Sequence, residues 1–249
     1  MKKLFYPCSG DDWKSIFDMF IDEIDDFIFA DLYYSNPDGF VEILQSNDFI
    51  GNINMIIEGN PNAKLSTSTE PDSKIHNDID PCYIRVSFEY KNNPKQILFR
   101  KGFAQYALNE IDDDSLDYFC HRGDSMGEGG SNVYFLSNRN SDHEPISRLF
   151  DKLVGKLKED SYILSDGSNV AFKKMIDFYE KIQNLSVEKV AEILPFTVVI
   201  GKINLIAIKC LDYRYNHTLM WQVSKEKNQL EDYRKKEGYT RSTYRHAHW

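Results

Sequence analysis

Lys3–Asp31 reads KLFYPCSGDDWKSIFDMFIDEIDDFIFAD, and no other segment says as much about the architecture. It has an apolar run at residues 3–6, a turn-forming segment from Pro7, and a second apolar run at residues 27–30. Between these runs, the apolar residues from Trp13 onward recur at spacings that place them on one face of a helix, with Asp11 or Asp12 as its cap. A strand, a loop, a helix and a second strand within about 30 residues predict the opening of a parallel α/β sheet.

The rest of the chain continues the alternation of strands and helices. Strands are expected at residues 52–57, 133–136 and 162–164, a hairpin at 83–90 with 96–99, helices after Pro37 and at 104–111, 145–157, 170–183 and 186–194, and a closing antiparallel pair at 196–211 with 218–223. We therefore predict an α/β fold over residues 1–224: a single Rossmann-like three-layer domain with a mostly parallel sheet and a C-terminal antiparallel hairpin. Residues 60–82 are expected to form a polar insertion loop, and residues 225–249 a charged tail.

Composition limits the function classes. The chain of 249 residues carries 39 acidic and 30 basic side chains, a formal charge of −9, so coating nucleic acid is not expected to be its main task. No apolar run approaches the roughly 20 residues that span a bilayer, and no signal peptide is recognisable, so a cytoplasmic protein without a membrane partner is expected. The four cysteines form no CxxC pair, which argues against a zinc or redox motif.

The first candidate site is the loop between the opening strand and helix. Ser9, Gly10 and Asp11 lie in this loop, and Asp31 ends the second strand. At the carboxyl edge of a parallel sheet, a small residue lets backbone N–H groups approach a ligand, and a carboxylate after the second strand can accept ribose hydroxyls. The alternative, weighed equally, is that Gly10 only forms a turn and Asp31 is a solvated strand end.

This arrangement resembles the opening of Rossmann-like folds, and specifically of the class I S-adenosylmethionine-dependent methyltransferases, whose first loop is glycine-rich and whose second strand ends in an acidic residue. The resemblance covers residues 3–31 and departs from the pattern in having Gly10 as the only glycine of the loop. It implies that Ser9, Gly10, Asp11 and Asp31 hold an S-adenosylmethionine-like cofactor. A dinucleotide fits less well, because the carboxylates of Asp11 and its neighbour would repel phosphate more than a zwitterionic methyl donor.

The second candidate site is a glycine cluster, with four of the chain's 13 glycines at residues 123–130. Around them stand His121, Arg122, Asp124 and Glu128, which supply an imidazole, a fixed cation and two carboxylates. Such a set could orient a substrate and exchange a proton, and we predict that these four residues are catalytic. The alternative is a flexible loop with an internal arginine–carboxylate pair. No metal site is predicted from this set.

Weaker candidates lie in the second half. Asp166 follows the strand at 162–164 and is explained equally well by an Asp-Gly turn, and His217 is expected to be structural or exposed. The sequence thus predicts a protein that binds a nucleotide or an S-adenosylmethionine-like small molecule in a cleft formed by the 8–12 loop, Asp31 and the 121–131 loop. It would be a methyltransferase-like enzyme or, alternatively, a non-enzymatic binding or interaction protein with a degenerate cofactor site.

Overall fold

The computed structural model describes residues 1–31, 34, 36–61, 81–102, 104–122, 135–136, 149–168, 170–201, 203–213 and 216–225. These described residues divide into two compact units, one from Met1 to Ile111 and one from Asp112 onward. Two compact units can belong to one domain, so the single domain over residues 1–224 stays a prediction. Among the described residues, no helix combines the length and the apolar character that crossing a bilayer requires.

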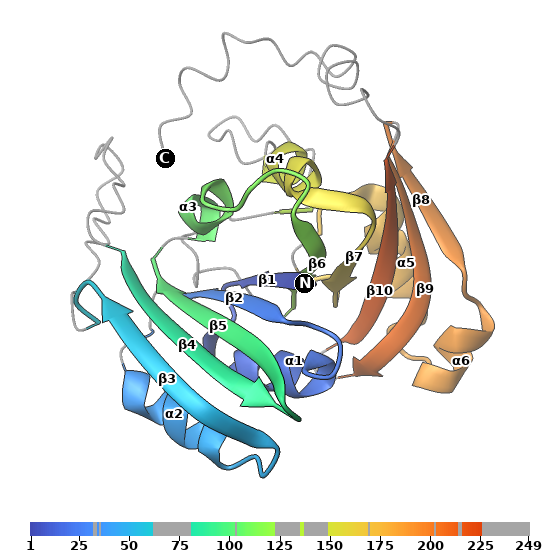
Figure 1. Cartoon of the computed structure of the whole chain (residues 1–249). Helices are drawn as coiled ribbons and strands as arrows, with labels where there is room; N and C mark the ends of the chain where they lie inside the picture. The colour runs from blue at the N-terminus through green and yellow to red at the C-terminus, as the bar shows by residue number, and fades with distance from the viewer. Residues whose placement is uncertain are drawn as a thin grey trace, which may run out of the picture. The chain divides into compact units, whose positions relative to one another are not determined.

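The first unit contains strands in the order β3-β4-β5-β2-β1 (Figure 1). The strands are β1 (Lys3–Pro7), β2 (Asp26–Asp31), β3 (Ile50–Glu58), β4 (Cys82–Tyr90) and β5 (Asn93–Lys101). The helices are α1 (Trp13–Phe20), α2 (Pro37–Gln45) and α3 (Ala104–Asn109). Strand β2 pairs in parallel with both β1 and β5, whereas β4 pairs antiparallel with β5 and β3 antiparallel with β4.

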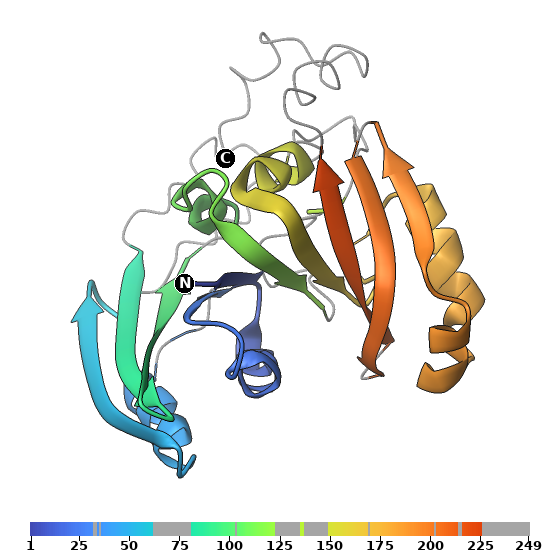
Figure 2. The same ribbon diagram turned by 45° about the vertical axis from the view of Figure 1, so that its right-hand side comes forward.

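Aromatic rings attach α1 and α2 to one face of this sheet. Trp13 of α1 meets Phe99 of β5 edge-on with 4.9 Å between ring centroids, and Phe40 of α2 stacks on Phe99 at 3.9 Å. Phe17 of α1 contacts Phe27 of β2 at 5.2 Å. Each such pair contributes about 0.5 to 1.5 kcal/mol beyond the burial of its area. Figure 2 shows the blue helices α1 and α2 beside the strands that they cover.

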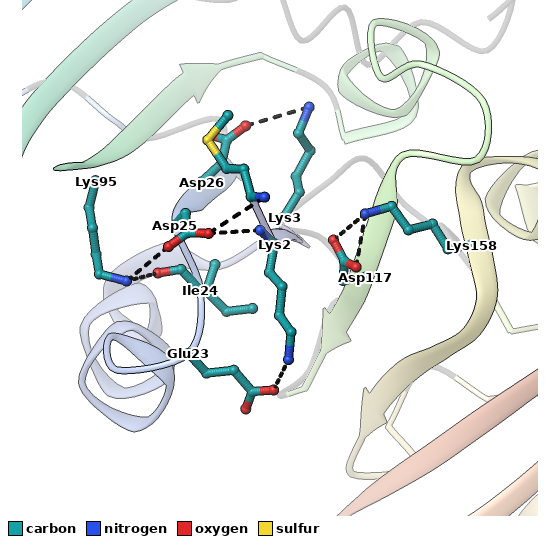
Figure 3. A network of polar contacts seen from close by, with 10 residues as sticks. Lys2, Lys3, Glu23, Ile24, Asp25, Asp26, Lys95, Asp117 and Lys158 are labelled. Carbon is teal, nitrogen blue, oxygen red and sulfur yellow. Dashed lines mark hydrogen bonds and ion pairs between the residues drawn. The ribbon is translucent and has the colours of Figure 1, made fainter. Parts of the chain in front are cut away.

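Charged groups fix the opposite face and the amino ends of the strands. Arg100 is buried on β5 and donates from Nε to Glu110 Oε2 at 2.8 Å and from Nη2 to Glu110 Oε1 at 2.6 Å. At the amino ends, the Lys95 ammonium donates to Ile24 O at 2.6 Å and to Asp25 Oδ1 at 3.3 Å (Figure 3). The Asp25 carboxylate also accepts the backbone N–H of Lys2, so β1, β2 and β5 are held in register where they begin.

The second unit contains strands in the order β6-β7-β10-β9-β8. The strands are β6 (Leu116–His121), β7 (Leu157–Ser165), β8 (Phe196–Ile200), β9 (Ile203–Tyr213) and β10 (His217–Lys225), and the helices are α4 (Leu149–Lys156), α5 (Lys173–Ile182) and α6 (Val187–Glu192). Strands β6 and β7 are parallel. Strand β10 pairs antiparallel with β7 and with β9, and β8 antiparallel with β9.

A buried tyrosine on α5 connects this helix to the sheet of the second unit. The Tyr179 hydroxyl donates to Ser165 O at 2.6 Å and accepts the Trp221 Nε1–H at 3.1 Å. Burial raises the pKa of Tyr179 well above its ordinary value, so the phenol keeps its proton and can donate. Phe178 of α5 stacks on Phe196 of β8 at 3.9 Å between ring centroids. These contacts fix the end of β7, where the chain turns at Asp166.

Most predicted elements of the first unit are confirmed. The strands at 3–6, 27–30 and 52–57, the hairpin at 83–90 with 96–99, and the helices after Trp13 and Pro37 all form. Asn36 caps α2, because its side chain accepts the Gly39 N–H. The α/β class is confirmed as well. The capping role predicted for Asp12 is wrong: it precedes α1 without a side-chain capping bond, and its carboxylate accepts the Tyr6 hydroxyl at 3.0 Å instead.

The expectation of a mostly parallel sheet is wrong. Among the strand pairs formed within the two units by described residues, three are parallel and five are antiparallel. Antiparallel pairs prevail because β3 and β4 extend the first sheet through hairpin geometry, and because β8, β9 and β10 form two consecutive antiparallel pairs. The three-layer arrangement stays a prediction.

Other differences concern the second half. Strand β6 was not predicted, and the expected strand at 196–211 is divided into β8 and β9 by a turn at Gly201, whose φ is 60°. The helices at 170–183 and 186–194 form as the shorter α5 and α6, and the strand at 162–164 is part of β7. Residues 62–80, 133–134, 145–148 and 226–249, on which further predictions fall, lie outside the described residues.

Candidate functional site

The loop after β1 lies at the carboxyl end of the parallel strands β1 and β2. Cys8 has a φ of 53° and Gly10 a φ of 47°, so both occupy the left-handed region. This region costs a non-glycine residue about 1 to 2 kcal/mol. The Ser9 N–H donates to Ala30 O at 3.3 Å, which ties the loop to the end of β2. Ligands of parallel α/β sheets bind at such an edge.

Asp31 presents a carboxylate to this loop. It ends β2, is 2% exposed, and accepts the Gly10 N–H on Oδ2 at 2.8 Å. Its backbone oxygen accepts the Gly102 N–H at 2.9 Å, which fixes the strand end against β5. A carboxylate accepts about four hydrogen bonds. Among the described residues other than its chain neighbours, a Cβ placed on Gly10 would meet only Asp31 Oδ2, at 4.0 Å.

Tyr34 belongs to the same group of residues. Its hydroxyl forms a hydrogen bond with Ser9 Oγ, and its ring meets those of Phe40 and Phe99 edge-on, each with 5.4 Å between centroids. Burial, and after it the carboxylate of Asp31, holds the pKa of Tyr34 well above its usual value, so the phenol stays neutral. The sequence analysis did not select Tyr34. The feature of the sequence that could have indicated Tyr34 is an aromatic residue with a hydroxyl group three residues after Asp31, the acidic end of β2.

The structure thus brings together three of the four residues predicted to hold a cofactor. Ser9, Gly10 and Asp31 are joined through the hydrogen bonds of one loop. Asp11 is exposed on the same loop. The segment from residue 7 to residue 12 carries no lysine, arginine or histidine. With Asp31 and Asp11 at this edge, the local charge favours a cationic or zwitterionic ligand over a phosphate.

In the second unit, His121 is the last residue of β6 and has no exposed surface. Neither ring nitrogen has a hydrogen-bond partner in the part of the chain that the structure describes. The nearest rings are those of Phe119 and Phe135, with centroids at 6.3 Å and 5.5 Å. Burial lowers the pKa of His121 to about 3, so the imidazole is neutral near pH 7. It can offer one donor and one acceptor but no charge.

Arg122 follows His121 and is also buried. Its Nη1 donates to Asp212 Oδ2 at 2.6 Å and lies 3.5 Å from Thr218 Oγ1. Arg122 therefore connects the carboxyl end of β6 to the end of the β9–β10 pair where β9 ends and β10 begins. Asp212 is distant from Arg122 in the sequence. The alternative stated from the sequence was instead an arginine–carboxylate pair inside the glycine-rich loop. The glycine cluster, Asp124 and Glu128 lie outside the described residues, so their catalytic roles stay predictions.

The other candidates have local explanations. Asp166 Oδ1 accepts the backbone N–H of Ser168 at 3.0 Å and its hydroxyl at 2.6 Å, and Gly167 has a φ of 85°, so the predicted Asp-Gly turn is confirmed. The described residues contain no group of three or more His, Cys, Asp or Glu side chains arranged to hold a metal ion.

Comparisons with known proteins give distant structural similarities. No protein-family model matches the chain, and no curated protein matches its sequence. Among solved structures, the chain is similar to Trm1 from Pyrococcus horikoshii in complex with S-adenosyl-L-methionine, with a TM-score of 0.41 and 11% sequence identity. The similarity covers 92% of this chain and 52% of that one, so the chain spans about half the length of this neighbour. At this level the similarity assigns neither a family nor an activity.

Proposed function

We propose that the first unit binds an S-adenosylmethionine-like nucleoside at the carboxyl edge of β1 and β2. The observation that carries this proposal is the buried Asp31 carboxylate, which accepts the Gly10 N–H at 2.8 Å at a position without a side chain of its own. In this arrangement Asp31 accepts ribose hydroxyls, and the open side of Gly10 lets the ligand approach the main chain.

The charge of the edge supports a sulfonium compound over a dinucleotide. Asp31 and Asp11 supply carboxylates, and the loop from residue 7 to residue 12 has no cationic side chain to receive a phosphate. An activated methyl group on a sulfonium is the chemistry that such a cofactor supplies when bound. Ser9, Gly10 and Asp31 would bind and orient it. Whether the protein transfers the methyl group stays a prediction.

Thermal unfolding of the full chain with S-adenosylmethionine, S-adenosylhomocysteine, adenosine and a nicotinamide dinucleotide tests this proposal. A ligand at 100 times its dissociation constant stabilises the folded state by about 2.7 kcal/mol, so a bound nucleoside raises the midpoint by several degrees. We expect the shift with the first compound and none with the dinucleotide.

Two variants assign the shift to the site. Asp31→Asn keeps an acceptor for the Gly10 N–H but loses the charge, and we expect it to abolish the shift without unfolding the protein. Asp11→Asn removes an exposed carboxylate of the same loop and should keep most of it. An undiminished shift in Asp31→Asn, or a shift with the dinucleotide alone, would show that the site is placed wrongly.

A non-enzymatic binding or interaction protein is the second candidate. Ser9 and Asp31 are each only 2% exposed, and the Ser9 hydroxyl is bonded to Tyr34, so the edge is closed by its own side chains. No thermal shift with any of the four compounds, in the wild type and in a Tyr34→Phe variant that releases the Ser9 hydroxyl, would favour this candidate.

A further inference from the structure

The β9–β10 pair brings a thiol and an imidazole together in the second unit. Cys210 of β9 and His217 of β10 lie with 3.7 Å between Sγ and Nδ1, within hydrogen-bonding reach of a thiol. Both are buried: His217 is 1% exposed and Cys210 7%. The expectation that His217 is structural or exposed gave it no chemical role. A nucleophile beside a base is the arrangement from which thiol catalysis starts.

A third group fixes the tautomer of the imidazole. His217 Nε2 lies 2.9 Å from Leu185 O, in the connection between α5 and α6. A carbonyl oxygen only accepts, so Nε2 carries the proton of this bond. In the neutral ring Nδ1 is then the bare nitrogen, and it faces the Cys210 thiol. The thiol thus corresponds to a nucleophile, the imidazole to its base, and the Leu185 oxygen to the group that positions the base.

We propose that Cys210 is a nucleophile activated by His217, and that it reacts with small uncharged electrophiles at carbon. In the reaction the sulfur forms a bond to the carbon, the leaving group departs with the electron pair of the bond that breaks, and the thiol proton passes to His217 Nδ1 and then to water. No oxidant or reductant is needed.

The charges around the pair explain why the base is required. Burial, followed by the carboxylates of Asp212 on β9 and Glu188 on α6, raises the pKa of Cys210 to about 11. At neutral pH the thiol therefore carries its proton, and little thiolate is present to react. Asp212 is ion-paired with Arg122, with 2.6 Å between Oδ2 and Nη1.

An exposed tyrosine lies beside the imidazole of this pair. Tyr213 is 57% exposed, and its ring meets the His217 ring edge-on with 5.1 Å between centroids. Exposed side chains change rotamer within nanoseconds, so we infer that the Tyr213 ring can move aside and admit a reagent of a few atoms to the pair. Anionic reagents are disfavoured by the neighbouring carboxylates. Small uncharged electrophiles are therefore the reagents expected to react.

Alkylation of the native full-length protein by iodoacetamide, followed by mass spectrometry of its peptides, tests the proposal. We expect Cys210 to be modified first among the four cysteines, and faster with iodoacetamide than with anionic iodoacetate when both rates are divided by those of free glutathione. His217→Gln should slow the reaction about 100-fold, the range that a general base supplies. Tyr213→Ala should accelerate it, and Tyr213→Phe, which keeps the ring, should leave it unchanged.

The dependence of the rate on pH decides the question even if His217→Gln fails to fold. With base assistance, the rate in the wild type levels off well below the pKa of about 11 of the Cys210 thiol. A thiol that reacts only as free thiolate instead gains about tenfold per pH unit up to its pKa. The second profile would overturn the proposal. The proposal would also be overturned if Cys210 were alkylated in urea but not in the native protein.

Discussion

Replacing His121 should remove a large part of the acid sensitivity of this protein. The imidazole has no exposed surface, and burial lowers its pKa to about 3 from an ordinary value of 6.5. Below pH 6.5 the unfolded chain therefore binds a proton at this residue that the folded chain does not. The contribution of His121 to stability is present above pH 6.5 and is lost as the pH falls toward 3. Between pH 7.5 and pH 5 the loss is about 2 kcal/mol.

The assay is urea unfolding of the wild type and of His121→Leu at these two pH values. The variant has a similar volume, fits between Phe119 and Phe135, and should lose about 2 kcal/mol less than the wild type between pH 7.5 and pH 5. Phe135→Leu is the matched control: it perturbs the same cluster of rings but keeps the imidazole, so its pH dependence should equal that of the wild type. Equal losses in His121→Leu and the wild type would refute the burial of a neutral His121.

Three further predictions concern stability and are measured by urea unfolding at pH 7.5. Gly10→Ala should destabilise the protein by about 1 kcal/mol, because the φ of Gly10 is 47°. Gly155→Ala should stabilise it by about 0.5 to 1 kcal/mol, because Gly155 lies in α4 and its Cβ position has no described neighbour within 4 Å. If both variants changed the free energy of unfolding in the same direction, the backbone argument would be contradicted. Glu110→Ala should cost about 2 kcal/mol because it leaves the Arg100 cation buried, and a cost near zero would contradict this pairing. Tyr179→Phe should cost about 1 to 3 kcal/mol because a buried indole N–H and a carbonyl lose the hydroxyl that joins them; an unchanged midpoint would speak against those bonds.

The two proposals rest on different units and are tested separately. The nucleoside proposal rests on Asp31 and Gly10 in the first unit and is measured by thermal shifts. The thiol proposal rests on Cys210 and His217 in the second and is measured by alkylation rates. A protein that binds no nucleoside can still carry an activated thiol. Failure of one proposal therefore leaves the other standing.

Local patterns in the sequence were enough to predict much of the first unit. The apolar runs around residues 3–6 and 27–30, and the helical spacing from Trp13, each involve neighbours along the chain, so their periodicity gives the element directly. Ser9, Gly10 and Asp31 could be selected because parallel strands place their carboxyl ends at a common edge.

Pairings between distant segments required the tertiary structure. Nothing near Cys210 in the sequence indicates that Leu185 orients the ring of His217, and nothing near Arg122 points to Asp212, because neither contact has a period along the chain. Whether a strand pairs in parallel or antiparallel depends on its neighbour in the sheet, which a single apolar run does not specify. Burial is decided in the same way. A histidine has one pKa in an isolated peptide, and it is the packing of aromatic rings around His121 that lowers it.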